Sequence, residues 1–273
     1  MPTVRISDAV IHYEEFGSGS PLLLLHGSGA NYRLFEPQIA SLGQHHRLII
    51  PHMRGHMESS PLPKVEYYHQ LMADDTQQFL RAVGLDRVPV YGESMGAVVA
   101  LLLAIRHPSC VERLIPVCGF SEMPDADSAA LLWLSNAVFS LLPMKTIVKL
   151  MLNVYPLHEE GNALARQVLL NSICIEKPFF VQLKTSKLLN FTDQLHRITA
   201  PTLIMGGTGL KLEERGSRNL YEHISGATLA LFKGGKDPLS ATRQAAHDAL
   251  VLDFLADRPL TAQAGVTLFG PRG

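Results

Sequence analysis

The sequence predicts an α/β protein with a doubly wound, mostly parallel eight-stranded sheet and a helical lid inserted between the sixth and seventh strands. Short continuous apolar runs such as PLLLLHG (21–27) and RVPVYG (87–92) alternate with helical patterns, as in strands buried on both faces of a parallel sheet. The alternation stops near Gly119, and residues 120–195 are mostly helical in pattern before strand patterns resume. This order indicates βαβ units interrupted by one insertion.

The individual elements follow from the same patterns. Residues 3–16 alternate like a hairpin of exposed strands. Buried strands are predicted at 21–27, 46–52, 87–92, 111–119, 200–207 and 227–235, and helices at about 33–42, 68–83, 96–106 and 240–255. The core is therefore expected at 1–119 and 196–257, with the lid at 120–195 and a loosely held tail at 258–273.

Composition narrows the class of protein. The chain has 273 residues, a formal net charge of −1 and no long run of charge, which favours neither nucleic acid nor an anionic membrane surface. It has no apolar window long enough to span a membrane and no signal-peptide pattern. Its 3 cysteines predict reduced thiols in a cytoplasmic protein. No cofactor motif or cluster of metal ligands is present, and a homodimer is left open.

One motif points to a nucleophile. In VYGESMGAVVA (90–100), Ser94 lies between Gly92 and Gly96, after an apolar strand and before a helix of small residues. Gly-x-Ser-x-Gly in this context forms a sharp turn that exposes the serine hydroxyl at the top of the sheet. The alternative is a tight strand-to-helix turn with a structural role only. A serine hydroxyl also needs a base to become a nucleophile.

A second motif predicts an oxyanion hole. The strand PLLLL ends in HGSG, where Gly27 shapes the turn and the backbone amide of Ser28 turns outward. Together with the amide of Met95, which follows the serine, it can stabilise an oxyanion. His26 is expected to be structural, with its ring bonded to nearby backbone, and a role in substrate binding is the alternative.

With these motifs the chain resembles the α/β-hydrolase fold superfamily, in its helical-lid branch of esterases, lactonases and related enzymes. The segment YGESMGAVVALLLAIRHPSCVERLIPV (91–117) is similar to the elbow, helix and following strand of that family, and the resemblance covers about residues 5–257. It implies a serine nucleophile, a histidine base and an acid that orients the histidine.

The chain departs from the family at both partners of the serine. The family's Asp-x-Arg-Gly motif appears here as HMRGHMES, with His52 in place of the aspartate. After the seventh strand, Leu210 falls at or beside the position of the triad acid. After the eighth strand, Lys236 falls in the position of the catalytic histidine. The resemblance therefore implies a degenerate triad.

Other groups could replace the missing base. Lys236 could serve if an apolar lid desolvated it, although an ion-paired loop lysine is the alternative. His52 and His56 lie on a strand expected two positions from the nucleophile strand, and His158 lies in the predicted lid. Glu93 is expected to pair at the start of the helix. An apolar pocket is predicted to be lined by His26, Trp133, Phe139, Met144, Met151, His158 and Leu210.

Three functions follow from these observations. The loss of the base and the acid favours a non-hydrolytic step on an apolar carbonyl compound, such as a cyclisation, dehydration or decarboxylation, of the kind found in natural-product pathways. The retained serine also allows an esterase, thioesterase or lactonase with a displaced base. The third function is a binder that keeps only the fold and the pocket, since a fold alone does not establish an activity.

Overall fold

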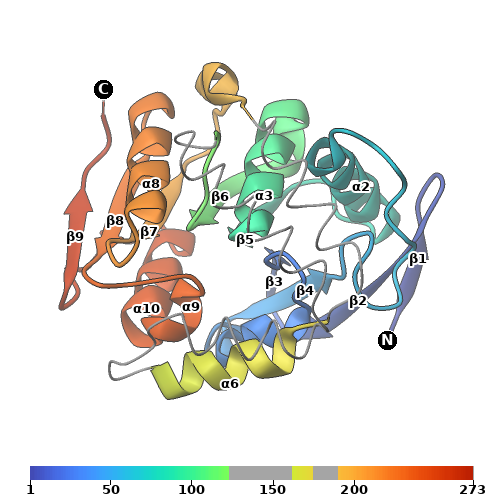
Figure 1. Cartoon of the computed structure of the whole chain (residues 1–273), viewed down its shortest axis with the longest axis horizontal. Helices are drawn as coiled ribbons and strands as arrows, with labels where there is room; N and C mark the ends of the chain where they lie inside the picture. The colour runs from blue at the N-terminus through green and yellow to red at the C-terminus, as the bar shows by residue number, and fades with distance from the viewer. Residues whose placement is uncertain (123–161, 175–189, 273) are drawn as a thin grey trace, which may run out of the picture.

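The computed structural model describes residues 1–122, 162–174 and 190–272, which form a single sheet covered on both faces by helices (Figure 1). Its order is β1-β2-β4-β3-β5-β6-β7-β8-β9. The strands are β1 (Thr3–Arg5), β2 (Val10–Phe16), β3 (Ser20–Leu25), β4 (His46–Pro51), β5 (Val88–Glu93), β6 (Val111–Val117), β7 (Leu203–Gly207), β8 (Thr228–Phe232) and β9 (Val266–Phe269). The predicted fold class is confirmed.

The centre of the sheet is parallel and its edges are antiparallel. Strands β4, β3, β5, β6, β7 and β8 pair in parallel, in registers such as Leu23 with Val90 and Met205 with Ala230. As predicted, β1 and β2 form an antiparallel hairpin, and β2 pairs antiparallel with β4. In the parallel part all strands end at the same edge, which brings the loops after β3, β5, β7 and β8 together.

The sheet has nine strands among the described residues, one more than predicted. Residues 258–273 were expected to form a loose tail, but Val266–Phe269 pairs antiparallel with β8, with Leu229 opposite Phe269. A strand of four residues at the edge lacks the long apolar run by which the central strands are recognised, and its pairing depends on the exposed edge of β8.

Two helical layers cover the sheet. One face is covered by α2 (Tyr68–Ala82), α3 (Met95–Arg106) and α8 (Lys211–His223), and the other by α1 (Glu36–Ser41), α9 (Leu239–Thr242) and α10 (Gln244–Leu255) (Figure 1). Helix α8 had not been predicted, because its polar sequence KLEERGSRNLYEH buries few side chains, among them Leu220. These layers bury the sheet on both faces.

The predicted lid falls mostly outside the described residues. Within it the structure places α6 (Asn162–Ser172), which buries Ala165 and Val168 in the core cluster shared with α9 and α10. Just after this helix, the backbone N–H of Cys174 donates to the carbonyl of Gly29 at 2.9 Å. The segment after α6 is thus tied to the loop that follows β3.

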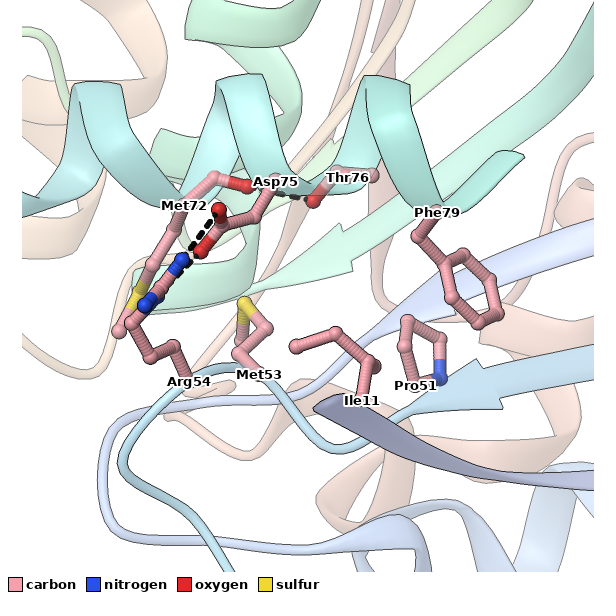
Figure 2. Close-up of a pocket in the computed structure, with 8 residues that line it drawn as sticks. All are labelled: Ile11, Pro51, Met53, Arg54, Met72, Asp75, Thr76 and Phe79. Atoms are coloured by element: carbon pink, nitrogen blue, oxygen red, sulfur yellow. Dashed lines mark hydrogen bonds and ion pairs between the residues drawn. The ribbon is translucent and has the colours of Figure 1, made fainter. Parts of the chain in front are cut away.

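A buried ion pair fixes the loop after β4 to helix α2. The Arg54 guanidinium donates to both carboxylate oxygens of Asp75, at 2.8 and 2.9 Å. Both side chains are nearly buried, at 3% and 6% exposed. Figure 2 shows the pair at one end of a cavity of about 10 Å³, between α2 and the β2 and β4 strands. A cavity of this size holds at most one water molecule.

Replacing Arg54 by alanine should lower the free energy of unfolding by about 3–5 kcal/mol, because the Asp75 carboxylate would stay buried without its partner. The matched control is Arg47→Ala, which removes a bidentate pair with Glu15 on the exposed edge of the sheet and should cost about 1 kcal/mol or less. Urea unfolding of both variants measures the difference. Equal losses would contradict the buried-pair account.

Candidate active site

Ser94 lies at a sharp turn between β5 and α3. Its backbone has φ 58° and ψ −118°, a left-handed region that non-glycine residues rarely adopt. Small neighbours make the turn feasible, since a Cβ on Gly96 would overlap the carbonyl oxygen of Leu25, and one on Gly92 would overlap the carbonyl of Gly96. A strained residue over-determined by its surroundings is typical of a functional site. The predicted elbow is therefore present.

The predicted oxyanion loop lies beside the elbow. A Cβ placed on Gly27 would be 3.4 Å from the Cβ of Ser94, so the loop after β3 approaches the serine closely. Met95 is the first residue of α3, where backbone N–H groups have no partner within the helix. Ser28 follows Gly27 in the same loop. An amide from each segment can thus face an oxygen bound at Ser94.

Two buried histidines connect this loop to the loop after β4 by hydrogen bonds. The Nε2 of His26 accepts the backbone N–H of Met53 at 3.2 Å, and the Nε2 of His56 accepts the backbone N–H of Gly29 at 3.1 Å. Since both Nε2 atoms are acceptors, each neutral ring carries its hydrogen on Nδ1. These Nδ1 atoms face backbone carbonyls, that of Gly27 at 2.9 Å for His26. The His26 ring is thus bonded to nearby backbone, as expected.

These two buried histidines make the free energy of unfolding depend on pH. Burial lowers the pKa of His56 to about 4, whereas an unfolded histidine titrates near 6.5. The unfolded chain therefore binds more protons between pH 6.5 and 4, and stability is lost as pH falls through that window. We expect His56 alone to contribute a loss of about 3 kcal/mol across it. His26 acts in the same direction, because burial also lowers its pKa.

The measurement is urea unfolding of wild type and of His56→Gln at pH 7, 6 and 5. Glutamine can accept the Gly29 N–H but does not titrate, so the variant should lose less stability on acidification. The control His45→Gln changes an exposed histidine and should leave the wild-type pH dependence intact. Parallel curves for all three proteins would refute this explanation.

Both ring nitrogens of His56 bind backbone groups of the two loops. This corrects the expectation that His56 could be the base for Ser94. His52 directly follows β4, which lies two positions from β5 in the sheet, as predicted. Its ring is stacked on Tyr32 with centroids 5.9 Å apart, and neither ring nitrogen has a hydrogen-bond partner among the described residues. Burial lowers the pKa of His52 to about 4. It is therefore a neutral ring at the side of the oxyanion loop.

Asp237, not Lys236, is the residue that the loop after β8 presents to Ser94. Burial raises the pKa of the Asp237 carboxyl well above its ordinary value, and the nearby carboxylates of Glu93 and Glu213 raise it further. The Ser94 side chain opposes this rise through its hydrogen bond with the carboxyl. A carboxyl group thus stands where the resemblance places histidine.

Neither Lys236 nor Leu210 takes the role expected of it: Asp237 is one residue after Lys236, and Glu213 is three residues after Leu210. The Lys236 side chain packs against Gly209, in the loop after β7, which corrects its placement in the histidine position. Leu210 is the residue before α8. The acid beside Asp237 is Glu213, in the first turn of that helix. Its Oε1 accepts the backbone N–H of Asp237 at 3.2 Å.

Two further groups complete the cluster. Cys118 directly follows β6 and has a positive φ of 50°, and its Sγ lies 4.0 Å from Oε2 of Glu213. Burial and the neighbouring carboxylates raise the pKa of this thiol well above its ordinary value. Glu93 is fully buried, and it pairs with Ser240 at the start of α9, not with the start of α3 as expected. The sequence signal missed was a pair of acids: Asp237, one residue after Lys236, and Glu213, three residues after Leu210.

The apolar pocket stays a prediction. Its lid members lie outside the described part of the chain: Trp133, Phe139, Met144, Met151 and His158.

In residues 1–122, 162–174 and 190–272, no group of three or more His, Cys, Asp or Glu side chains is placed to hold a metal ion. No described helix is long and apolar enough to cross a membrane.

Comparison with known proteins finds similarity to one fold family. Residues 20–138 match the model of the alpha/beta hydrolase fold family. An uncharacterized hydrolase of Bacillus subtilis is 34% identical over 115 residues, which is 42% of each chain. A 2-hydroxymuconate semialdehyde hydrolase of a Pseudomonas strain is 36% identical over 105 residues, or 36% of each chain. The chain thus matches about two fifths of the length of these curated relatives.

Solved structures extend the similarity to almost the whole chain. The enol-lactonase of Burkholderia xenovorans has a TM-score of 0.77 at 21% identity, with 93% of this chain and 100% of that chain covered. An alpha/beta hydrolase from a Medee basin deep-sea metagenome library has a TM-score of 0.80 at 18% identity, with 96% and 100% covered. At such identities the likeness concerns the fold. Together with the family model that matches residues 20–138, it shows that the chain has the α/β-hydrolase fold.

Proposed function

We propose that the protein is an enzyme that hydrolyses an ester, thioester or lactone, with Ser94 as nucleophile and Asp237 as its general base. The observation that carries this proposal is the Asp237 carboxyl facing the Ser94 side chain, at the end of the sheet where the elbow and the Gly27 loop also meet. Several similar proteins are named hydrolases, which supports hydrolysis more than the non-hydrolytic interpretation.

The reaction needs no group beyond these. Ser94 Oγ attacks the carbonyl carbon while its proton passes to the Asp237 carboxylate. The amides of Met95 and Ser28 stabilise the oxyanion. Asp237 then returns the proton to the departing alcohol or thiol, and a water molecule repeats the sequence on the acyl-enzyme. A carboxylate is ordinarily too weak a base near neutral pH. Burial and two neighbouring carboxylates raise its pKa toward the range in which a general base is effective.

One observation favours the non-hydrolytic alternative as a second candidate. A carboxyl group with a raised pKa can be held protonated, and it then donates a proton to a bound substrate instead of accepting one from Ser94. Such a donor next to an oxyanion hole suits a dehydration, cyclisation or decarboxylation of a carbonyl compound. A binder without catalysis is the remaining alternative. An apolar substrate and a homodimer stay predictions of the sequence.

Intact-mass analysis after exposure to a fluorophosphonate probe tests the hydrolase proposal. We expect one adduct on the wild-type protein and none on Ser94→Ala, because only an activated serine displaces fluoride from the probe. The control Ser7→Ala removes an exposed serine and should label like wild type. A folded wild-type protein without an adduct would overturn the serine-nucleophile mechanism and favour the proton-donor or binder alternatives.

A further inference from the structure

A buried contact connects the elbow to the segment that carries Asp237. The side chain of Glu93, which directly precedes Ser94, is 0% exposed. Its Oε1 accepts the backbone N–H of Ser240 at 3.0 Å, and its Oε2 accepts the hydroxyl of Ser240 at 2.5 Å. The backbone N–H of Leu239 also donates to this carboxylate. One side chain of the elbow thus binds three donors of the loop after β8.

The segment from Lys236 to Thr242, which contains Ser240, is closed by hydrogen bonds of its own. The hydroxyl of Thr242 donates to the carbonyl of Lys236 at 2.8 Å, and the backbone N–H of Thr242 donates to the carbonyl of Pro238 at 3.0 Å. Asp237 lies inside this closed turn. Its distance from Ser94 therefore depends on where Glu93 holds Ser240.

We propose that Glu93 is a positioning residue, whose carboxylate holds the Asp237 segment against the elbow and places a like charge beside Asp237. This inference rests on the proposed hydrolase function and adds to it. The mechanism assigns no step to Glu93, yet a buried carboxylate is costly unless it is hydrogen-bonded or used. Here both its oxygens are bound, and the charge lies near the group whose basicity the reaction needs.

Several other groups face this pair. Asp237 is faced by Glu213 of α8, Cys118 at the end of β6 and Ser94, and Lys236 precedes it in the chain. Glu93 is faced by His247 of α10 and by Tyr91 of its own strand. The Nδ1 of His247 contacts the Asp248 carboxylate at 2.7 Å, and its Nε2 contacts the Tyr91 hydroxyl at 3.0 Å. Ser94 and Tyr91 also contact this segment, and Glu93 is the acidic side chain that binds it from the elbow side.

The test is the rate of phosphonylation of Ser94 by the fluorophosphonate probe, measured from pH 5 to 9. Glu93→Gln removes the charge but can keep both contacts, since its amide oxygen accepts the Ser240 N–H and its amide N–H donates to the Ser240 hydroxyl. We expect the midpoint of the rate profile to fall by about one pH unit, because a like charge near Asp237 is lost. A purely structural role would not move the midpoint.

Ser240→Ala is the complementary variant, because it keeps the charge and removes one donor. Its rate should fall about tenfold at every pH with the midpoint unchanged, and an unchanged rate would overturn the positioning role. This variant carries the test by itself if Glu93→Gln fails to fold. Glu112→Gln, an exposed glutamate of β6, should match wild type in rate and midpoint.

The outcomes separate the two proposals. If the wild-type profile is lost in Asp237→Asn but is unmoved in Glu93→Gln, the role of Glu93 is wrong and the hydrolase mechanism stands. If wild type is not labelled, or if its profile is the same in Asp237→Asn, the mechanism fails and the role of Glu93 fails with it.

Discussion

Asp237→Asn should lower the rate of Ser94 phosphonylation by about 10²–10⁴-fold, the range that a general base contributes. Asparagine has nearly the shape of aspartate and can still face the Ser94 hydroxyl, but it cannot accept the serine proton. The loss should come without a large loss of stability, because the substitution also removes a carboxylate that crowds Glu93 and Glu213. The rate is measured by intact mass against time at fixed probe concentration.

The control for this variant is Asp86→Asn, which changes an exposed aspartate in the turn before β5. It should react at the wild-type rate. Thermal unfolding of each protein separates a lost base from a lost fold. Wild-type rates in a folded Asp237→Asn protein would show that another group activates Ser94.

Asp237→His should raise the same rate by about 10²-fold near neutral pH, because imidazole is a stronger base than a carboxylate and is already matched to that pH. The position is suitable because Glu213 already binds the backbone N–H of residue 237. Its carboxylate would orient the new ring and stabilise the imidazolium, as the acid of a triad does. The substitution would build a Ser–His–Glu triad from groups that are already in place.

Two further variants test this geometry. Glu213→Gln in the Asp237→His background should remove most of the gain, because the ring would lose its acidic partner. Lys236→His in the wild-type background should give no gain, since residue 236 packs against Gly209, whereas Asp237 is the residue that hydrogen-bonds with Ser94. A gain in Lys236→His and none in Asp237→His would show that the register of this loop is wrong.

Most of the sheet could be predicted from the sequence, because its central strands are buried on both faces and are therefore continuous apolar runs. Helices α2 and α3 also begin and end within about two residues of the expected bounds. Helix α8 and strand β9 were missed. One is a largely polar helix that covers the sheet with few buried side chains, and the other is a short edge strand that exists only through its pairing with β8.

The candidate site was predicted in its local parts and missed in its long-range parts. The Ser94 elbow and the Gly27 loop are continuous motifs, so the sequence contains their whole signal. The contacts of Asp237 with Ser94 and Glu213 join three loops that are far apart in the chain. Alignment to family spacing placed Lys236 and Leu210 there, because a change of residue type left no motif to mark the true positions.

The most direct test of the central claim is the pH dependence of Ser94 phosphonylation in the wild-type protein. If Asp237 is the base, the rate rises with pH through a single ionisation, since the raised-pKa carboxyl must lose its proton before it can accept one from Ser94. The same rise should be absent in Asp237→Asn. A rate that falls as pH rises, or a profile that Asp237→Asn leaves intact, would contradict the account.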